Sequence, residues 1–215
     1  AVTPDRNRQP EAHSANIQMI KNVINVFQQS RPLSHLTYIS SDAVYGDAEH
    51  IDEITATQPN SLYGEMHLTR EHLISKLDIP TAIFRPTMLY GKNDTHTSYG
   101  ISRLINEARV GPINLFGKGE EFRDYIHVED AAGIISCAVN KKSKGVWNIA
   151  SGHSTSFLEL TKLIEACQDK PLEIKYLERK QAITHKYFYI QSLRDSFPHC
   201  AIPNAETDIF QIVEQ

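Results

Sequence analysis

The sequence predicts an α/β fold: a doubly wound parallel sheet with a small C-terminal lobe. Two observations predict this class. Short apolar, β-branched runs alternate with segments whose apolar residues recur at helical spacing, which is the order of a parallel sheet with crossover helices. The chain has 215 residues, of which 40% are hydrophobic and 22% charged. That length is enough for one substantial core and a satellite subdomain.

The first half of the chain supplies two helices and two strands of this sheet. Residues 14–28 are predicted to form a helix with Ser14 as its cap, because five apolar side chains share one face: Ile17, Ile20, Val23, Ile24 and Phe27. Residues 35–40 read as a buried strand that opens into a loop at its C-terminal end. Helical spacing returns over 62–77, and a second buried strand over 79–86 is stopped by a proline.

The second half alternates in the same way. We expect a helix near 101–109, a strand at 113–116, a helix at 131–139 and a strand at 146–150. Ser156 and Glu159 form a capping box that opens a further helix. We assign 1–91 and 131–150 to the C-terminal part of a cofactor-binding domain, and 92–130 and 151–215 to a substrate-binding lobe.

The order of elements leaves the strand at 35–40 as a long apolar edge. Proteins normally cover such edges, because they invite pairing with other chains. We therefore expect the N-terminal half of the sheet to come from a preceding segment that this sequence lacks, or from another chain.

Composition excludes several classes of function. The net charge of −4 and the pI near 6.2, with scattered Lys and Arg, argue against nucleic-acid and membrane partners. The chain has no apolar run long enough to span a bilayer and no signal peptide, which predicts a cytoplasmic protein. Its three cysteines, Cys137, Cys167 and Cys200, match neither a disulfide framework nor a zinc pattern, and no histidine spacing predicts a metal site.

Three residues point to redox chemistry on an alcohol. Ser41 follows the strand at 35–40, and Tyr63 begins the helix at 62–77, with His67 one turn further along. A hydroxyl at the end of a strand and a phenol beside a basic side chain can together handle the proton of a carbinol. The sequence therefore predicts a site formed by these three residues.

Five runs in this order resemble the extended short-chain dehydrogenase/reductase family, specifically its NAD-dependent nucleotide-sugar epimerases and dehydratases: 40–46, 63–67, 84–91, 123–131 and 147–152. The resemblance implies a Rossmann-like sheet, NAD as cofactor with NADP left open, and a nucleotide-sugar substrate. It also implies a homodimer formed through the helices at 14–28 and 62–77.

The resemblance assigns catalysis to Tyr63, Ser41 and His67, and cofactor contacts to Tyr63, His67, Pro86 and Asn16. The family has lysine at position 67. A tyrosine must lower its pKa from ~10 toward ~7, about 4 kcal/mol of stabilisation, to act as a base near neutral pH. Histidine is a poorer cation for this task than lysine. The alternative is that His67 is a surface helix residue in a site that has lost its catalyst.

Substrate contacts are assigned to Ser41, Asp42, Arg123 and Thr87. Arg123 matches an arginine that binds the diphosphate, and the alternative is a salt bridge to Asp124 or Glu129. Ala43 stands where the 4,6-dehydratases have a carboxylate base, which disfavours dehydration. Asn16 interrupts an apolar helix face, so we expect it to be hydrogen-bonded, either in the site or as a helix-entry cap.

The family's glycine fingerprint is missing. Gly117 and Gly119 are the nearest approach to a glycine loop, and we interpret them as a turn and not as a phosphate cradle. The leading hypothesis is an NAD-dependent nucleotide-sugar epimerase without its N-terminal cofactor half. Two alternatives stay open: a non-catalytic protein that binds a sugar nucleotide or serves in an assembly, and an NAD-dependent reductase that makes a deoxysugar.

Overall fold

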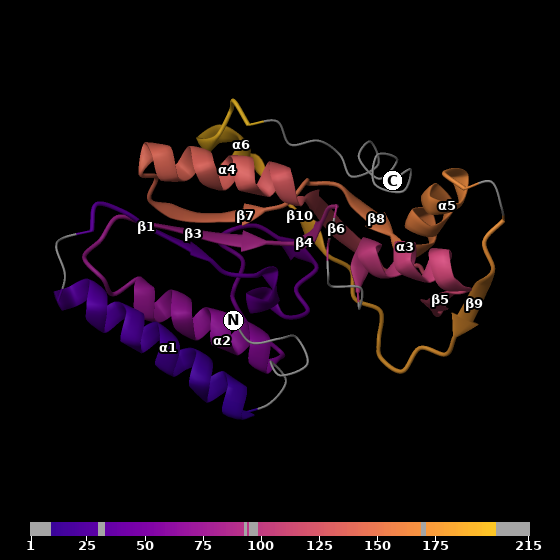
Figure 1. Ribbon diagram of the computed structural model, residues 1–215, viewed down its shortest axis with the longest axis horizontal. Helices are drawn as coiled ribbons and strands as arrows, with labels where there is room; N and C mark the ends of the chain where they lie inside the picture. Colours follow the sequence, from indigo (N-terminus) through magenta and orange to yellow (C-terminus); the bar gives the residue numbers. More distant parts are fainter. Residues whose placement is uncertain (1–9, 30–32, 93, 95–98, 169–170, 201–215) are drawn as a thin grey trace.

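The computed structural model describes residues 10–29, 33–92, 94, 99–168 and 171–200. Its central element is a parallel sheet in the order β1 (Leu36–Ile39), β3 (Thr81–Pro86) and β7 (Gly145–Ile149) (Figure 1). In register, Tyr38 pairs with Ile83, and Ile83 pairs with Val146. The three strands therefore end at one edge, where polar residues follow them.

Helices cover both faces of this sheet. α1 (Pro10–Gln29) and α2 (Leu62–Ile74) lie on one side, and α4 (Val128–Lys141) and α6 (Gln191–Ser196) lie on the other (Figure 1). Phe84 on β3 lies at the centre of the core, with its ring 5.6 Å from Trp147 and 6.5 Å from Phe197. The predicted α/β class, with helices on both faces, is confirmed.

A second region is built around its own apolar core. It contains α3 (Gly100–Val110), α5 (Phe157–Ala166) and the parallel pair β5 (Ile113–Phe116) and β9 (Ile174–Leu177). Three strands join it to the first region: β4 (Met88–Tyr90), β6 (Phe122–His127) and β8 (Ser154–Ser156). A short pair, β2 (His50–Ile51) and β10 (Tyr187–Phe188), lies beside them. The division of the chain into two domains stays a prediction.

The predicted elements are present with shifted ends. The capping box at Ser156 and Glu159 and the strand at 113–116 are confirmed. The first helix begins at Pro10, so Ser14 lies inside it and is not its cap. This helix packs on α2 and not directly on the sheet, which is why Asn16 is its one buried residue in the described part of the chain. The strand β6 was not predicted, because it carries charged residues.

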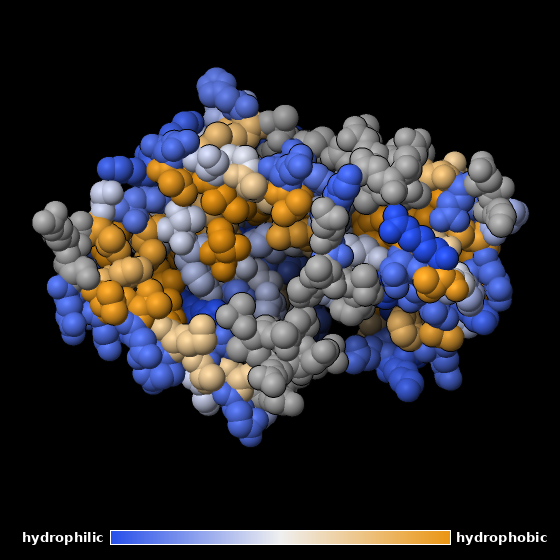
Figure 2. Space-filling view, viewed as in Figure 1, coloured by the Kyte–Doolittle hydropathy of each residue, from blue (hydrophilic) through white to orange (hydrophobic). Residues whose placement is uncertain are grey.

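The strand β1 is an edge strand within the described residues, as expected, since it pairs with β3 alone. Figure 2 shows hydrophobic residues gathered at the end of the molecule where β1 and the last turns of α1 lie. Exposed side chains of these elements include Ile39 (41%), Val23 (42%) and Val26 (58%).

Two features bear on the predictions from composition. None of the described helices combines the length and hydrophobicity that a membrane span needs. The thiols of Cys137 on α4 and Cys200 lie 3.0 Å apart, although their sequence spacing gave no sign of this contact.

Candidate active site

Ser41 lies directly beyond the carboxyl end of β1. It caps the short helix η1 (Asp42–Tyr45) by accepting a hydrogen bond from the Ala43 amide at 3.2 Å, and it is 7% exposed. Its neighbour Ser40 bonds Glu71 on α2. These contacts hold the Ser41 hydroxyl at the edge of the sheet.

Tyr63 is brought to Ser41 by a close approach of α2 to η1. A Cβ on Gly64 would lie 2.4 Å from the carbonyl oxygen of Ala43, so this position cannot carry a side chain without moving the helix. Ser61 caps α2 by accepting from the Gly64 amide at 3.2 Å. Tyr63 is 38% exposed, and the nearby Ser41 hydroxyl acts to lower the pKa of its phenol against the larger, raising effect of burial. The close packing of α2 on η1 thus brings Tyr63 near Ser41, and the catalytic pairing of the two hydroxyls stays a prediction.

His67 lies behind Tyr63 and is 7% exposed, so the alternative of a surface residue is wrong. Its ring meets the Tyr63 ring edge-on at 4.6 Å, and its Nδ1 lies 2.9 Å from the hydroxyl of Tyr38. Burial and, less strongly, the charge of Arg70 together lower the pKa of His67 to about 4, against the opposing effect of Glu71. His67 is therefore neutral at neutral pH.

Asn16 is buried inside α1, so the alternative of a helix-entry cap is wrong. Its Oδ1 accepts from Arg70 at 2.7 Å, which is the specific partner that its burial demanded. Arg70 was not singled out from the sequence. A helical repeat places it on the same side of α2 as Tyr63 and His67, and that is the signal that could have found it.

Asp42 faces a lysine that the sequence analysis also missed. The ammonium of Lys186 lies 3.1 Å from Oδ2 of Asp42. Pro86 ends β3, and Thr87 follows it with its hydroxyl donating to the main-chain oxygen of Asp124 at 3.0 Å. Both are buried.

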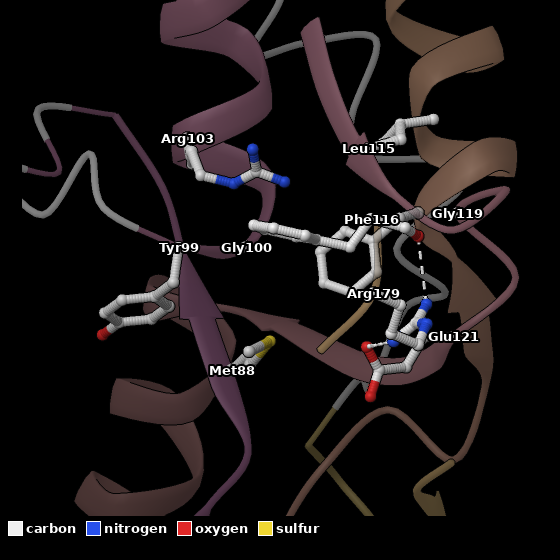
Figure 3. Close-up of a pocket in the computed structure, with 10 residues that line it drawn as sticks. Met88, Tyr99, Gly100, Arg103, Leu115, Phe116, Gly119, Glu121 and Arg179 are labelled. Atoms are coloured by element: carbon white, nitrogen blue, oxygen red, sulfur yellow. Dashed lines mark hydrogen bonds and ion pairs between the residues drawn. The ribbon is translucent and has the colours of Figure 1, made fainter. Parts of the chain in front are cut away.

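A pocket of about 230 Å³ opens beside this cluster, in the second region. It is lined by ten residues: Met88, Tyr99, Gly100, Arg103, Leu115, Phe116, Gly119, Glu121, Phe157 and Arg179. Figure 3 shows Phe116 between Arg103 and Arg179. Burial raises the pKa of Tyr99, and Asp94, Tyr63 and Asp42 add to this rise.

The carboxylate of Glu121 bridges two arginines at this pocket. Its Oε1 accepts from Arg123 at 2.7 Å, and its Oε2 accepts from Arg179 at 3.1 Å. Burial pushes the pKa of Glu121 upward, but the two guanidinium groups and Thr184 outweigh it, and the pKa is lowered. The predicted alternative of an Arg123 pair with Asp124 or Glu129 is wrong, because Glu121 is the partner. Asp124 instead accepts from Ser151 and Gly152.

The turn at Gly117 and Gly119 follows β5, as predicted, and its glycines face the protein itself. A Cβ on Gly119 would lie 3.1 Å from the main-chain nitrogen of Leu158, and one on Gly117 would lie 3.0 Å from the Glu120 carboxylate. The Lys118 amide already donates to Glu120 at 2.7 Å. This turn therefore closes the loop and leaves no cradle for a phosphate.

Known proteins resemble this chain in sequence and in fold. The chain is 27% identical over 133 residues to dTDP-glucose 4,6-dehydratase of Salmonella typhimurium, covering 54% of this chain and 37% of that protein. It is 31% identical over 129 residues to dTDP-L-rhamnose 4-epimerase of Burkholderia thailandensis, covering 54% of this chain and 35% of that protein. The chain thus spans little more than a third of these relatives' length.

The fold matches that of UDP-glucuronic acid 4-epimerase from Bacillus cereus, solved in complex with UDP-glucuronic acid and NAD. The TM-score is 0.81 at 22% identity, covering 93% of this chain and 66% of that one. The sequence profile of the NAD dependent epimerase/dehydratase family matches residues 1–150, more than half of the chain. The protein belongs to that family.

Proposed function

We propose that this protein is an NAD-dependent nucleotide-sugar epimerase. The observation that carries the proposal is the partly exposed Tyr63 phenol, held near Ser41 by the close contact of α2 with η1, at the carboxyl edge of a parallel sheet. Ligands of open α/β sheets bind at this edge. The similar proteins named above include an epimerase whose structure holds a UDP-sugar and NAD.

The donor set around Tyr63 fits the nicotinamide and ribose end of NAD. A phenol, a serine hydroxyl and a nearby guanidinium can bond ribose hydroxyls and a carboxamide. Tyr63 would hold that end, with Asn16 and His67 behind it and Pro86 at the end of β3. The bound cofactor would accept a hydride from the sugar and return it. These side chains suit NADP equally.

The chain's own residues handle the proton and the developing charge. Tyr63 takes the proton from a sugar hydroxyl, while Ser41 donates a hydrogen bond to the substrate oxygen. Burial raises the pKa of Tyr63, and this effect outweighs the lowering by Ser41 and Arg70. The phenol is therefore protonated at neutral pH, and turnover is expected to rise with pH.

The pocket suits the nucleoside diphosphate of the substrate. Arg103 and Arg179 line it, so two guanidinium groups lie where they could meet phosphate oxygens, while Arg123 lies behind Glu121 and is bonded to it. Phe116 and Phe157 give apolar ring surface to a base or sugar. Thr87 and Asp42 would contact the sugar nearer to Ser41.

Epimerisation is favoured over dehydration by the residues after Ser41. Water elimination needs an acid and a base, and Ala43 can be neither. The carboxylate of Asp42 is already engaged by Lys186 at 3.1 Å.

We further infer a homodimer formed through α1 and α2. Three hydrophobic side chains of α1 are exposed to solvent: Met19 (45%), Val23 (42%) and Val26 (58%). A partner helix packed on this face would remove them from water. A cytoplasmic location stays a prediction.

The test is conversion of UDP- and dTDP-hexoses by Tyr63→Phe, which keeps the ring and loses the hydroxyl. Loss of the general base should lower turnover by about 10³-fold, while binding of the sugar nucleotide persists. Tyr176→Phe is the matched control, because Tyr176 lies on β9 and is 59% exposed. If the parent bound sugar nucleotides but neither bound NAD nor converted any hexose, the non-catalytic alternative would replace this proposal.

A further inference from the structure

Arg70 is clamped to α1 by neutral oxygen atoms. Its Nη2 donates to Oδ1 of Asn16 at 2.7 Å and to the main-chain oxygen of Asn16 at 3.1 Å. Asn16 is 3% exposed, and its amide donates to the main-chain oxygen of Ala12 at 2.8 Å, which fixes its orientation. No acid of the described chain pairs with Arg70. Its charge is therefore held in place without being compensated.

The clamped guanidinium belongs to a continuous cluster that ends at Tyr63. The Tyr38 hydroxyl lies 2.9 Å from Nδ1 of His67, and the charge of Arg70 acts on this phenol, lowering its pKa against the larger effect of burial. His67 in turn packs against the Tyr63 ring. The Nε of Arg70 is buried and has no partner among the described residues. Arg70 lies three residues after His67 and seven after Tyr63, so all three share one side of α2.

Other charged and titratable groups also face Tyr63, and none of them supplies a free cation in the part of the chain described. From η1 come Ser41 and Asp42, and Asp42 bears a negative charge paired with Lys186. From the start of α3 comes the neutral phenol of Tyr99.

From α2 itself come His67 and Arg70. Burial and the Arg70 charge lower the pKa of His67 to about 4, so it is neutral. The next residue, Glu71, is engaged by Arg85 on β3 at 2.6 Å. A guanidinium stays protonated at every working pH. Arg70 is therefore the permanent charge that acts on Tyr63 from this helix.

We propose that Arg70 is a positioning residue of the active site: its guanidinium, clamped by Asn16, stabilises the ionised form of Tyr63 in place of a cation at position 67. This inference rests on the proposed function of Tyr63 as the base. It explains how a neutral His67 is compatible with a working site, since the positive charge comes from one turn further along the same helix.

The experiment titrates the Tyr63 phenol directly in the full 215-residue protein. Ultraviolet absorbance of tyrosinate is followed against pH, and the curve of Tyr63→Phe is subtracted to isolate Tyr63. Arg70→Gln should shift the midpoint to higher pH and lower turnover at neutral pH roughly tenfold, the order expected for one lost charge interaction. Arg70→Lys keeps the charge and should restore most of both.

His67→Gln is the matched comparison on the same helix. Because His67 is already neutral, its replacement should leave the Tyr63 midpoint close to that of the parent. The inference is overturned if Arg70→Gln has the midpoint of the parent, or if His67→Gln shifts the midpoint as far as Arg70→Gln does.

Asn16→Asp tests the same idea without changing Arg70, and it decides the matter if Arg70→Gln does not fold. The new carboxylate would neutralise the guanidinium, so the Tyr63 midpoint should rise, and an unchanged midpoint would overturn the inference.

The two proposals fail separately. If Tyr63→Phe turned over like the parent, the proposed function would fail while the titration result stood. If Tyr63→Phe were inactive but Arg70 left the midpoint unaltered, only the Arg70 inference would fail.

Discussion

The arginines of the pocket and the arginine beside Tyr63 differ in their partners. Arg103 pairs with Glu107 at 2.8 Å, and Arg123 and Arg179 share Glu121. Arg70 instead bonds the neutral oxygens of Asn16, within the described part of the chain. The pocket arginines are thus compensated and hold loops in place, whereas Arg70 keeps its charge available to its neighbours.

The difference shows how one residue type serves two purposes in one molecule. A guanidinium paired with a carboxylate has a weak field at a distance, because the two charges cancel. A guanidinium held by an amide and a carbonyl has the same fixed geometry and its full field. For Arg70 to keep its full field, the acids near it on α2 must be paired with other cations. The ion pair of Glu71 with Arg85 meets this condition.

Glu71→Gln should have the largest effect on stability, because it breaks this arrangement. Arg85 is buried, and its Nε and Nη2 both donate to Glu71, at 3.0 and 2.6 Å. Removing the acid leaves a buried charge without compensation, which costs about 3 kcal/mol or more of unfolding free energy. Urea denaturation measures it. Glu65→Gln, at an exposed position on the same helix, is the control and should change stability by less than about 0.5 kcal/mol.

His67 should make the protein sensitive to acid. Its pKa is lowered from 6.5 to about 4 by burial and by Arg70, so the unfolded chain binds a proton between these values that the folded chain does not. Stability therefore falls as pH falls through this window, by about 3 kcal/mol between neutral pH and pH 4. His67→Gln should therefore lose less unfolding free energy than the parent between neutral pH and pH 4, as measured by urea denaturation at both pH values. Equal acid sensitivity of parent and variant would contradict the prediction.

The sequence predicted the first region well, because its signals are local. The spacing of Leu62 and Met66 defines α2, and Ser41 and Tyr63 each lie at the end of a strand or the start of a helix. Such positions meet at the carboxyl edge of a parallel sheet wherever the fold is of this class. That Ser41 and Tyr63 lie near one another at this edge was therefore predictable without coordinates.

Arg70 and Glu121 were missed because their roles depend on contacts that no local pattern encodes. Arg70 acquires its clamp only where α1 crosses α2, and Asn16 is 54 residues away in the chain. Glu121 and Arg123 point to one side because the chain is extended there, with alternate residues on one face. Asp124 points to the other side and bonds Ser151. Recognising β6 as a strand would have excluded Asp124 as the partner of Arg123.

The smallest effect is expected for the arginines that are paired with a carboxylate, Arg123 and Arg179. Glu121→Gln removes the carboxylate that Arg123 and Arg179 share, so the positive charge of the pocket rises and the Nη1 of Arg179 loses its anionic partner. Uridine diphosphate should then bind about tenfold more tightly, a gain of about 1.4 kcal/mol, with a steeper loss of affinity as salt rises. Titration calorimetry at two salt concentrations measures both. Glu107→Gln, which frees Arg103 in the same pocket, is the matched control for charge. Weaker binding by Glu121→Gln would mean that the carboxylate orients the arginines for the ligand and does not compete with it.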